Sequence, residues 1–177
     1  MTVVARLREL FRDRRARVAL NVLAVLGIWL GASAYQTRRH VAARAPDFTL
    51  SDLSGRRVAL HDFRKQKVVL HFFATWCGVC KAELPSVRNV QANLGKDEVL
   101  LAIAEDADDP AALRRFAAEH DLRYPILLGT HEVLAAYGVD RFPTNYYLNG
   151  DGSVSSSTAG LSTLVGMRLR LWRAVAP

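Results

Sequence analysis

Cysteine is scarce in this sequence, since only Cys77 and Cys80 occur in 177 residues. One pair cannot build the framework of several disulfides that stabilises small secreted domains. A structural zinc site needs four ligands, and no second cysteine pair is present to complete one. The histidines show no pairing at metal-ligand spacing; they stand at positions 40, 61, 71, 120 and 131. We therefore expect no metal and no cofactor, and we look for chemistry in the cysteine pair itself.

An excess of basic residues is also missing from most of the chain. The net charge is +7, and residues 1–44 account for it with nine arginines against two acids. Residues 45–177 hold 15 basic and 15 acidic residues and are neutral overall. A nucleic-acid-binding domain needs a basic surface to neutralise phosphates. We therefore do not expect nucleic acid as a partner.

The one long apolar stretch follows the basic segment directly. Residues 18–35 are interrupted only by Asn21, Gly27, Gly31 and Ser33. Eighteen residues is the short end of the length that a membrane-spanning helix needs, and a basic flank stays in the cytoplasm. We expect residues 1–17 to be cytoplasmic, 18–35 to be a transmembrane signal-anchor and 36–45 to be a linker. The domain at 46–177 then lies on the far side of the membrane.

Two alternatives remain open for the apolar segment. It resembles a cleavable signal peptide, because Ala32-Ser33-Ala34 has the small-x-small form of a cleavage site. It also has the composition of a buried core helix. A basic flank before an apolar run at the extreme N-terminus is, however, a targeting pattern, and this favours export.

Strand and helix patterns alternate through the remaining residues. The expected strands are 48–50, 58–60, 67–74, 98–104, 124–128, 144–148 and 153–157, and the expected helices are 78–93, 110–120, 131–137 and 162–174. Strands separated by helices form parallel crossover units, while Asn149-Gly150-Asp151-Gly152 predicts a final antiparallel hairpin. The pattern predicts an α/β domain with a mixed sheet and helices on both faces. The last helix is expected to have one apolar side, made of Leu161, Leu164, Val165, Met167, Leu171 and Trp172.

The sequence Trp76-Cys77-Gly78-Val79-Cys80 lies where a predicted buried strand passes into a predicted helix. A thiol at a helix N-terminus faces unpaired N–H groups and the positive end of the helix dipole, and both favour the nucleophilic thiolate. The spacing places the second sulfur one turn along on the same side. We predict that Cys77 attacks a substrate and that Cys80 resolves the mixed disulfide.

The segment from Pro46 to Pro85, with FFATWCGVC and a following ELP, resembles the TlpA-like thioredoxins. Those proteins are bacterial, membrane-anchored and periplasm-facing. The chain length and GMRLRLW at 166–172 are similar to the ScsD branch, which is associated with suppression of copper sensitivity. The resemblance implies a thioredoxin fold and disulfide exchange with periplasmic protein thiols and disulfides. It also implies a membrane thiol protein that supplies electrons, and a single-pass location in the bacterial inner membrane.

The resemblance also assigns a cis proline, because Phe142-Pro143-Thr144 occupies the position of the family's proline beside the CxxC pair. A cis bond at Pro143 would present the backbone of Phe142 to an extended substrate, with Thr144 next to it. An ordinary trans proline at a strand start is the alternative. Relatives commonly carry a small or β-branched residue where Phe142 stands, so this residue bears on substrate preference.

His71 lies six residues before Cys77, where thioredoxin-like proteins often carry a buried acid beneath the resolving cysteine. We hypothesise that His71 accepts the proton of Cys80, with a hydrogen-bonded core histidine as the alternative. Trp76 is expected to form an apolar platform for substrate, with core packing as the alternative. We expect Lys81 and Glu83 to lie on a solvated helix face, and the acidic run at 105–109 to be a solvated loop.

These observations favour a membrane-anchored thiol-disulfide oxidoreductase that acts on proteins, and they leave both the reducing and the oxidising direction open. The resemblance adds a link to copper or oxidative stress. A cytochrome c maturation thiol reductase is one alternative, although those members usually carry an acid where Thr144 stands. A copper-binding or copper-delivery module is another, because soft thiolates suit Cu(I). Copper-chaperone relatives, however, have a longer cysteine spacing and a paired histidine.

Overall fold

The computed structural model describes Val18, residues 21–25, Gly27 and residues 44–176. The described residues between 18 and 27 are helical. Across the described part of the chain, no helix combines the length and the apolar character needed to cross a membrane. The predicted cytoplasmic segment, most of the predicted transmembrane segment and nearly all of the linker lie outside the described residues. The membrane anchor therefore stays a prediction.

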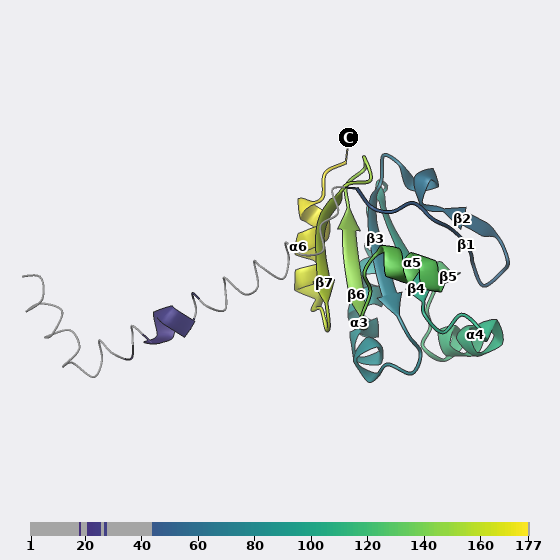
Figure 1. The fold of residues 1–177 in the computed structure, drawn as a ribbon, viewed down its shortest axis with the longest axis horizontal. Helices are drawn as coiled ribbons and strands as arrows, with labels where there is room; N and C mark the ends of the chain where they lie inside the picture. Colours follow the sequence, from purple (N-terminus) through teal and green to yellow (C-terminus); the bar gives the residue numbers. More distant parts are fainter. Residues whose placement is uncertain (1–17, 19–20, 26, 28–43, 177) are drawn as a thin grey trace, which may run out of the picture. The chain divides into compact units, whose positions relative to one another are not determined.

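A five-stranded sheet forms the centre of the domain in the order β5-β4-β3-β6-β7 (Figure 1). Its strands are β3 (Lys67–Phe73), β4 (Glu98–Ala104), β5 (Ile126–Leu128), β6 (Thr144–Leu148) and β7 (Val154–Ala159). The first three strands run parallel, and β6 and β7 are antiparallel additions. A separate hairpin joins β1 (Thr49–Ser51) to β2 (Arg57–Ala59). The predicted mixed sheet is confirmed, with boundaries shifted by up to two residues.

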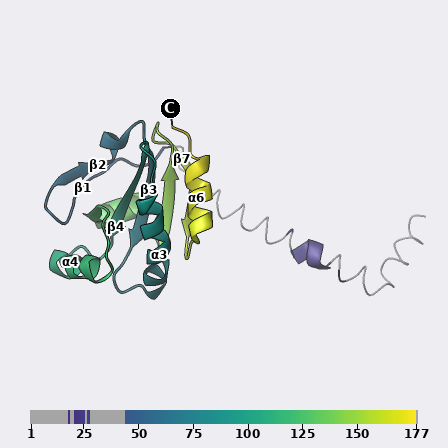
Figure 2. The same cartoon turned by 180° about the vertical axis from the view of Figure 1, so that it is seen from behind.

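Helices cover both faces of this sheet, as the two opposite views show (Figures 1 and 2). On one face the buried core joins the sheet to α3 (Gly78–Ala92), α4 (Pro110–Glu119) and α6 (Leu164–Arg173). On the other face it joins the sheet to β1, β2, α5 (His131–Ala136) and a 3-10 turn, η1 (Leu60–Phe63), that the sequence did not predict. Strand β3 is buried on both sides, which explains its continuous apolar sequence.

Polar side chains begin most of the helices. Asp109 accepts a hydrogen bond from the Ala112 N–H at 2.9 Å, and Pro110 takes the first position of α4, where a missing N–H is tolerated. Thr130 and Thr163 cap α5 and α6 in the same way. Helix α3 differs, because its N-cap is Cys77. The helix that carries the cysteine pair is therefore capped by the side chain of the first of the two cysteines.

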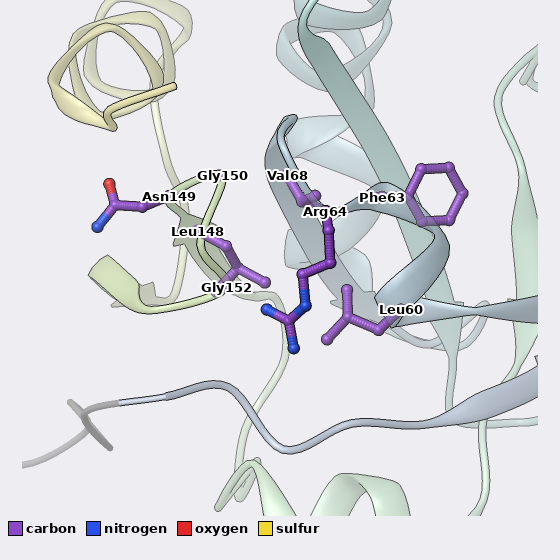
Figure 3. Close-up of a pocket in the computed structure, with 8 residues that line it drawn as sticks. All are labelled: Leu60, Phe63, Arg64, Val68, Leu148, Asn149, Gly150 and Gly152. Carbon is purple, nitrogen blue, oxygen red and sulfur yellow. The ribbon is translucent and has the colours of Figure 1, made fainter. Parts of the chain in front are cut away.

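The turn at 149–152 gathers three distant segments at one end of the sheet. Its Gly152 carbonyl accepts from the Ala45 N–H at 3.0 Å, and its Gly150 N–H donates to the Val175 carbonyl at 2.9 Å. The Arg64 guanidinium donates to the Asp151 carbonyl at 2.8 Å. Figure 3 shows a pocket beside this turn, lined by Leu60, Phe63, Arg64, Val68, Leu148, Asn149, Gly150 and Gly152. Segments close to the two ends of the described domain therefore meet at this turn.

The last helix corrects the prediction of a single apolar side. Met167, Leu171 and Ala174 are buried against the sheet, and Leu164 is half-buried there. Leu161, Val165 and Trp172, which were expected on the same side, are 60%, 76% and 74% exposed. Leu169 joins them at 45%. Helix α6 thus has one apolar stripe that is buried and a second that is exposed.

Candidate active site

The cysteine pair lies at the carboxyl end of β3, at the first turn of α3. Cys77 Sγ accepts a hydrogen bond from the Cys80 N–H at 3.1 Å. Both cysteines are free thiols; Cys77 is 7% exposed and Cys80 is 0% exposed. A backbone N–H aimed at sulfur stabilises negative charge on it. The geometry therefore suits Cys77 to meet a substrate and Cys80 to act from beneath.

Burial decides the behaviour of the inner thiol. It raises the pKa of Cys80 to about 12, and the neighbouring Cys77 thiol and the charge of Glu83 act in the same direction. A thiol with this pKa is protonated at neutral pH, whereas the attacking species in disulfide exchange is the thiolate. Cys80 therefore needs a proton acceptor nearby before it can attack.

The peptide bond between Phe142 and Pro143 is cis, as the resemblance implied. The Cys77 thiol donates to the Phe142 carbonyl oxygen across 3.7 Å, so the backbone before the proline lies beside the outer sulfur. Thr144 is buried, and its hydroxyl donates to the Arg141 carbonyl at 2.8 Å. Thr144 therefore braces the turn that carries Pro143, while its predicted part in substrate binding stays a prediction.

An exposed apolar rim surrounds Cys77. Trp76 is 65% exposed, so its alternative as a core residue is wrong. Its indole ring meets the ring of the half-buried Phe142 edge to face, with centroids 6.0 Å apart. Val79, one of the two residues between the cysteines, is 47% exposed. These three side chains offer an apolar contact surface next to the sulfur, and the predicted substrate roles of Trp76 and Phe142 stay predictions.

The acidic run after β4 is more than the solvated loop that the sequence suggested. The Trp76 indole N–H donates to Glu105 at 3.2 Å. Asp106 accepts from the Thr75 N–H at 3.2 Å and from the Thr75 hydroxyl. Two acids of this run therefore hold the residues that lead into Cys77.

Glu83 is the residue that the sequence interpretation placed wrongly. It is 0% exposed, not solvated, and it accepts a hydrogen bond from the Ser162 N–H at 2.6 Å. The Asn145 amide donates to it at 3.4 Å. A signal was available, because Cys80, Glu83, Leu84 and Val87 follow the i, i+3, i+4, i+7 pattern of a buried helix face.

His71 completes a buried polar cluster with these groups. Its Nδ1 lies 2.8 Å from Asn145 Oδ1 and 3.5 Å from Glu83 Oε2. Because an amide oxygen only accepts, the Asn145 orientation that donates to Glu83 gives His71 a proton on Nδ1. His71 Nε2 is buried without a hydrogen-bond partner among the described residues. The cluster thus joins β3, α3, β6 and the loop before α6 beneath the cysteines.

Burial drives the two ionisable members of this cluster toward their neutral forms. It raises the pKa of Glu83, against the hydrogen bonds from Ser162 and Asn145. It lowers the pKa of His71 to about 4, against the hydrogen bond with Asn145. Desolvation penalises a charge of either sign, which explains the opposite directions. Among the described residues, no group of three or more His, Cys, Asp or Glu side chains could hold a metal ion.

Comparison with known proteins agrees with this architecture. Residues 41–157 match the AhpC/TSA family. The chain is 33% identical over 152 residues to the thiol-disulfide oxidoreductase ResA of Geobacillus thermodenitrificans. This match covers 84% of the present chain and 87% of the relative. It is 32% identical over 160 residues to the thioredoxin-like protein YneN of Bacillus subtilis, with 85% and 93% covered. A solved structure of a thiol:disulfide interchange protein DsbE from Chlorobium tepidum has a TM-score of 0.68 and 25% identity, covering 75% of this chain and 95% of that chain.

The pKa of His71 predicts a pH-dependent stability. Its folded value of about 4 lies below its ordinary value of 6.5, so between these pH values the unfolded chain binds a proton that the folded chain does not. The contribution of His71 to stability is therefore complete above pH 6.5 and is lost as the pH falls toward 4, by up to about 3 kcal/mol. His71→Asn, which keeps a donor for Asn145, should flatten this decline in the free energy of unfolding, measured by urea denaturation.

His131→Asn, at an exposed position of α5, is the matched control for the loss of one imidazole. It should keep the wild-type decline between pH 6.5 and pH 4. An equal flattening by both substitutions would contradict the assignment to His71.

Proposed function

This chain belongs to the AhpC/TSA family and is a thioredoxin-fold protein-disulfide oxidoreductase, and we propose how its side chains divide the reaction. Cys77 forms the mixed disulfide with a partner protein, Cys80 resolves it, and Glu83 takes the proton that Cys80 must lose. The observation that carries the proposal is the arrangement of Cys77, Cys80 and Glu83 at the start of α3. The outer sulfur faces the rim, and the inner thiol is buried with an acid close enough to act on its charge.

The first step is attack by the Cys77 thiolate on a disulfide of the partner. A bond forms between Cys77 Sγ and one substrate sulfur, and the other substrate sulfur leaves as a thiolate. The Cys80 N–H already points at Cys77 Sγ and stabilises its negative charge. The backbone beside Pro143 lies next to this sulfur, where an extended chain can pair with it. The rim of Trp76, Val79 and Phe142 contacts the side chains of the bound segment.

The second step is attack by Cys80 on Cys77 Sγ of the mixed disulfide. The Cys80 proton passes to Glu83, the Cys77–Cys80 bond forms, the bond between Cys77 and the attached substrate sulfur breaks, and that sulfur leaves as a thiolate. The substrate disulfide is thereby reduced by two electrons, and the cysteine pair is oxidised by two. A second thiol protein restores the dithiol, and the same steps in reverse transfer a disulfide to a reduced partner.

We assign His71 and Asn145 to positioning within this scheme. The groups whose charge acts on Cys80 are Cys77 and Glu83, whereas His71 contacts Glu83. The hypothesis that His71 accepts the proton of Cys80 directly stays a prediction, and the distance of 3.5 Å between His71 Nδ1 and Glu83 Oε2 favours an action through Glu83. Asn145 bridges the two, donating to Glu83 and accepting from His71.

We also propose that the catalytic domain works outside the cytoplasm on a membrane anchor formed by residues 18–35. The support is the order of the sequence, with a strongly basic segment, an apolar run and then a neutral domain. A redox-active cysteine pair suits an oxidising compartment, where such a pair exchanges continually. A bacterial inner membrane with the domain in the periplasm fulfils these conditions.

The order of attack predicts which cysteine variant traps substrate. Cys80→Ser should accumulate a mixed disulfide between Cys77 and an oxidised protein such as insulin, because the resolving thiol is gone. Cys77→Ser, the matched control, should accumulate almost none, since Cys80 is 0% exposed. Mass spectrometry after acid quenching measures both adducts. Equal trapping by the two variants would contradict the assigned order.

The proton-acceptor role predicts a selective loss in Glu83→Gln. The amide keeps the size of the side chain and cannot take the Cys80 proton, so resolution of the mixed disulfide should slow by about 100-fold at neutral pH. Attack by Cys77 should change by no more than a few-fold. Rapid-quench kinetics with a single turnover separates the two steps.

Glu132→Gln removes an exposed carboxylate on α5 and serves as the control for a lost acid. It should leave both rates at the wild-type level. If Glu83→Gln resolved the mixed disulfide at the wild-type rate, Glu83 would not be the proton acceptor.

The anchor predicts the fate of the full chain in a bacterial cell. The intact mass of residues 1–177 should be found in the membrane fraction and should resist an alkaline carbonate wash. Val22→Asp with Val25→Asp should release the protein or block its export, because charges at the centre of a span are costly. Gln36→Asp with Thr37→Asp, in the predicted linker, is the matched control. A shortened chain in the soluble fraction would instead establish a cleaved signal peptide.

A further inference from the structure

The outer face of α6 is an exposed apolar stripe that the redox chemistry does not use. Its members recur at intervals of three or four residues, so the three within α6 line one side of the helix, and the other two lie just beyond its two ends. They are Leu161, Val165, Leu169, Trp172 and Val175, with exposures from 45% to 76%. Single exposed apolar residues are ordinary, whereas three along one helix with two more just beyond its ends mark an interaction surface.

Cations surround this stripe. Residues 160–177 contain Arg168, Arg170 and Arg173 and no acid. None of these arginines forms an ion pair within the described part of the chain. Arg168 donates to the Asn93 carbonyl at 2.7 Å, and Arg170 donates to the Gly166 carbonyl at 3.0 Å. Their guanidinium groups are therefore free of acidic side chains around an apolar centre.

The neighbouring helix extends the same charge. Helix α3 packs beside α6 on the same face of the sheet (Figure 2) and adds Lys81 and Arg88, while its one acid, Glu83, is buried. Outside these two helices, residues 45–177 hold 10 basic and 14 acidic residues. Helices α3 and α6 together thus carry five basic residues and no exposed acid, whereas the rest of the domain has four more acidic than basic residues.

The chain enters the domain close to the C-terminal end of this stripe. Ala45, the last residue of the predicted linker, hydrogen-bonds to Gly152, and Val175 hydrogen-bonds to Gly150 of the same turn. A linker of ten residues reaches at most about 35 Å. A domain of this size has a radius of gyration of about 14 Å. A membrane anchor before the linker would therefore keep α6 within reach of the lipid surface.

We propose that the outer face of α6 docks onto the anionic lipid surface of the membrane in which the chain is anchored. The proposal rests on the membrane anchor proposed above. Val165, Leu169 and Trp172 would enter the boundary between headgroups and acyl chains, to a depth of about 5–10 Å. The arginines of α6 would bind lipid phosphates beside them, and tryptophan suits this depth because its ring is apolar with one polar group. The domain would then rest on the outer face of α6.

Tryptophan fluorescence of the full chain in bilayer discs tests this docking. The chain has three tryptophans, so Trp29→Phe with Trp76→Phe leaves Trp172 alone, and Trp29→Phe with Trp172→Phe leaves Trp76 as the matched control. The discs contain phosphatidylglycerol and phosphatidylcholine with brominated acyl chains. We expect bromine to quench Trp172 at least about two-fold more strongly than Trp76, because only Trp172 lies on the docked face.

The excess quenching of Trp172 should fall in discs of phosphatidylcholine alone, at high salt, and in Val165→Glu with Leu169→Glu. Equal quenching of the two tryptophans would overturn the docking. Docking would also be overturned if Trp172 were shielded from water, were not quenched by bromine and crosslinked to a second copy of the chain. That outcome would make this face a dimer contact. Failure of the chain to co-elute with the discs would instead reject the anchor and the docking together. Oxidation of the dithiol, assayed in the same samples, reports separately on the redox function.

Discussion

Desolvation of Cys80 is the constraint on which the working of this domain depends. A thiol that is 0% exposed cannot ionise readily, yet it must do so to complete each exchange. The protein meets this requirement with a second buried ionisable group, Glu83, instead of opening the site to water. A buried carboxylate is costly unless it is hydrogen-bonded, and Ser162 and Asn145 supply those bonds. The loop before α6 is therefore part of the active site, although it lies far from the cysteines in sequence.

The pairing register of the strands in the sheet positions the other residues of the site. Strand β3 ends three residues before Trp76, so the strand-to-helix turn delivers the cysteines to its carboxyl end. Strand β6 pairs with it antiparallel, with Thr144 opposite Phe72. This register brings Pro143, one residue earlier, to the same end of the sheet as Cys77. It also sets Asn145 opposite His71, and the two side chains meet in the cluster beneath.

The parts of this protein that the sequence predicted are those that local patterns determine. The CxxC pair at a strand-to-helix junction, the alternation of strands and helices and the final hairpin turn follow from neighbouring residues. The cis bond before Pro143 was available only through the resemblance. The burial of Glu83, the support that Asp106 gives to Thr75 and the second apolar stripe of α6 were not predicted. Each depends on which other element lies opposite, and a charged residue on an amphipathic helix is more often solvated than buried.

The charge states of the two ionisable partners in the cluster determine how much new charge a proton transfer there creates. Glu83 has a raised pKa, so its contribution to stability is complete at low pH and is lost as the pH rises through the folded value. His71 has a lowered pKa and responds in the opposite sense, so neutral His71 dominates above its folded value of about 4. With His71 neutral, transfer of a proton from Cys80 to an ionised Glu83 moves one negative charge between two buried groups and creates none. The step therefore avoids the desolvation of a new charge, which is the largest barrier to ionising a buried thiol.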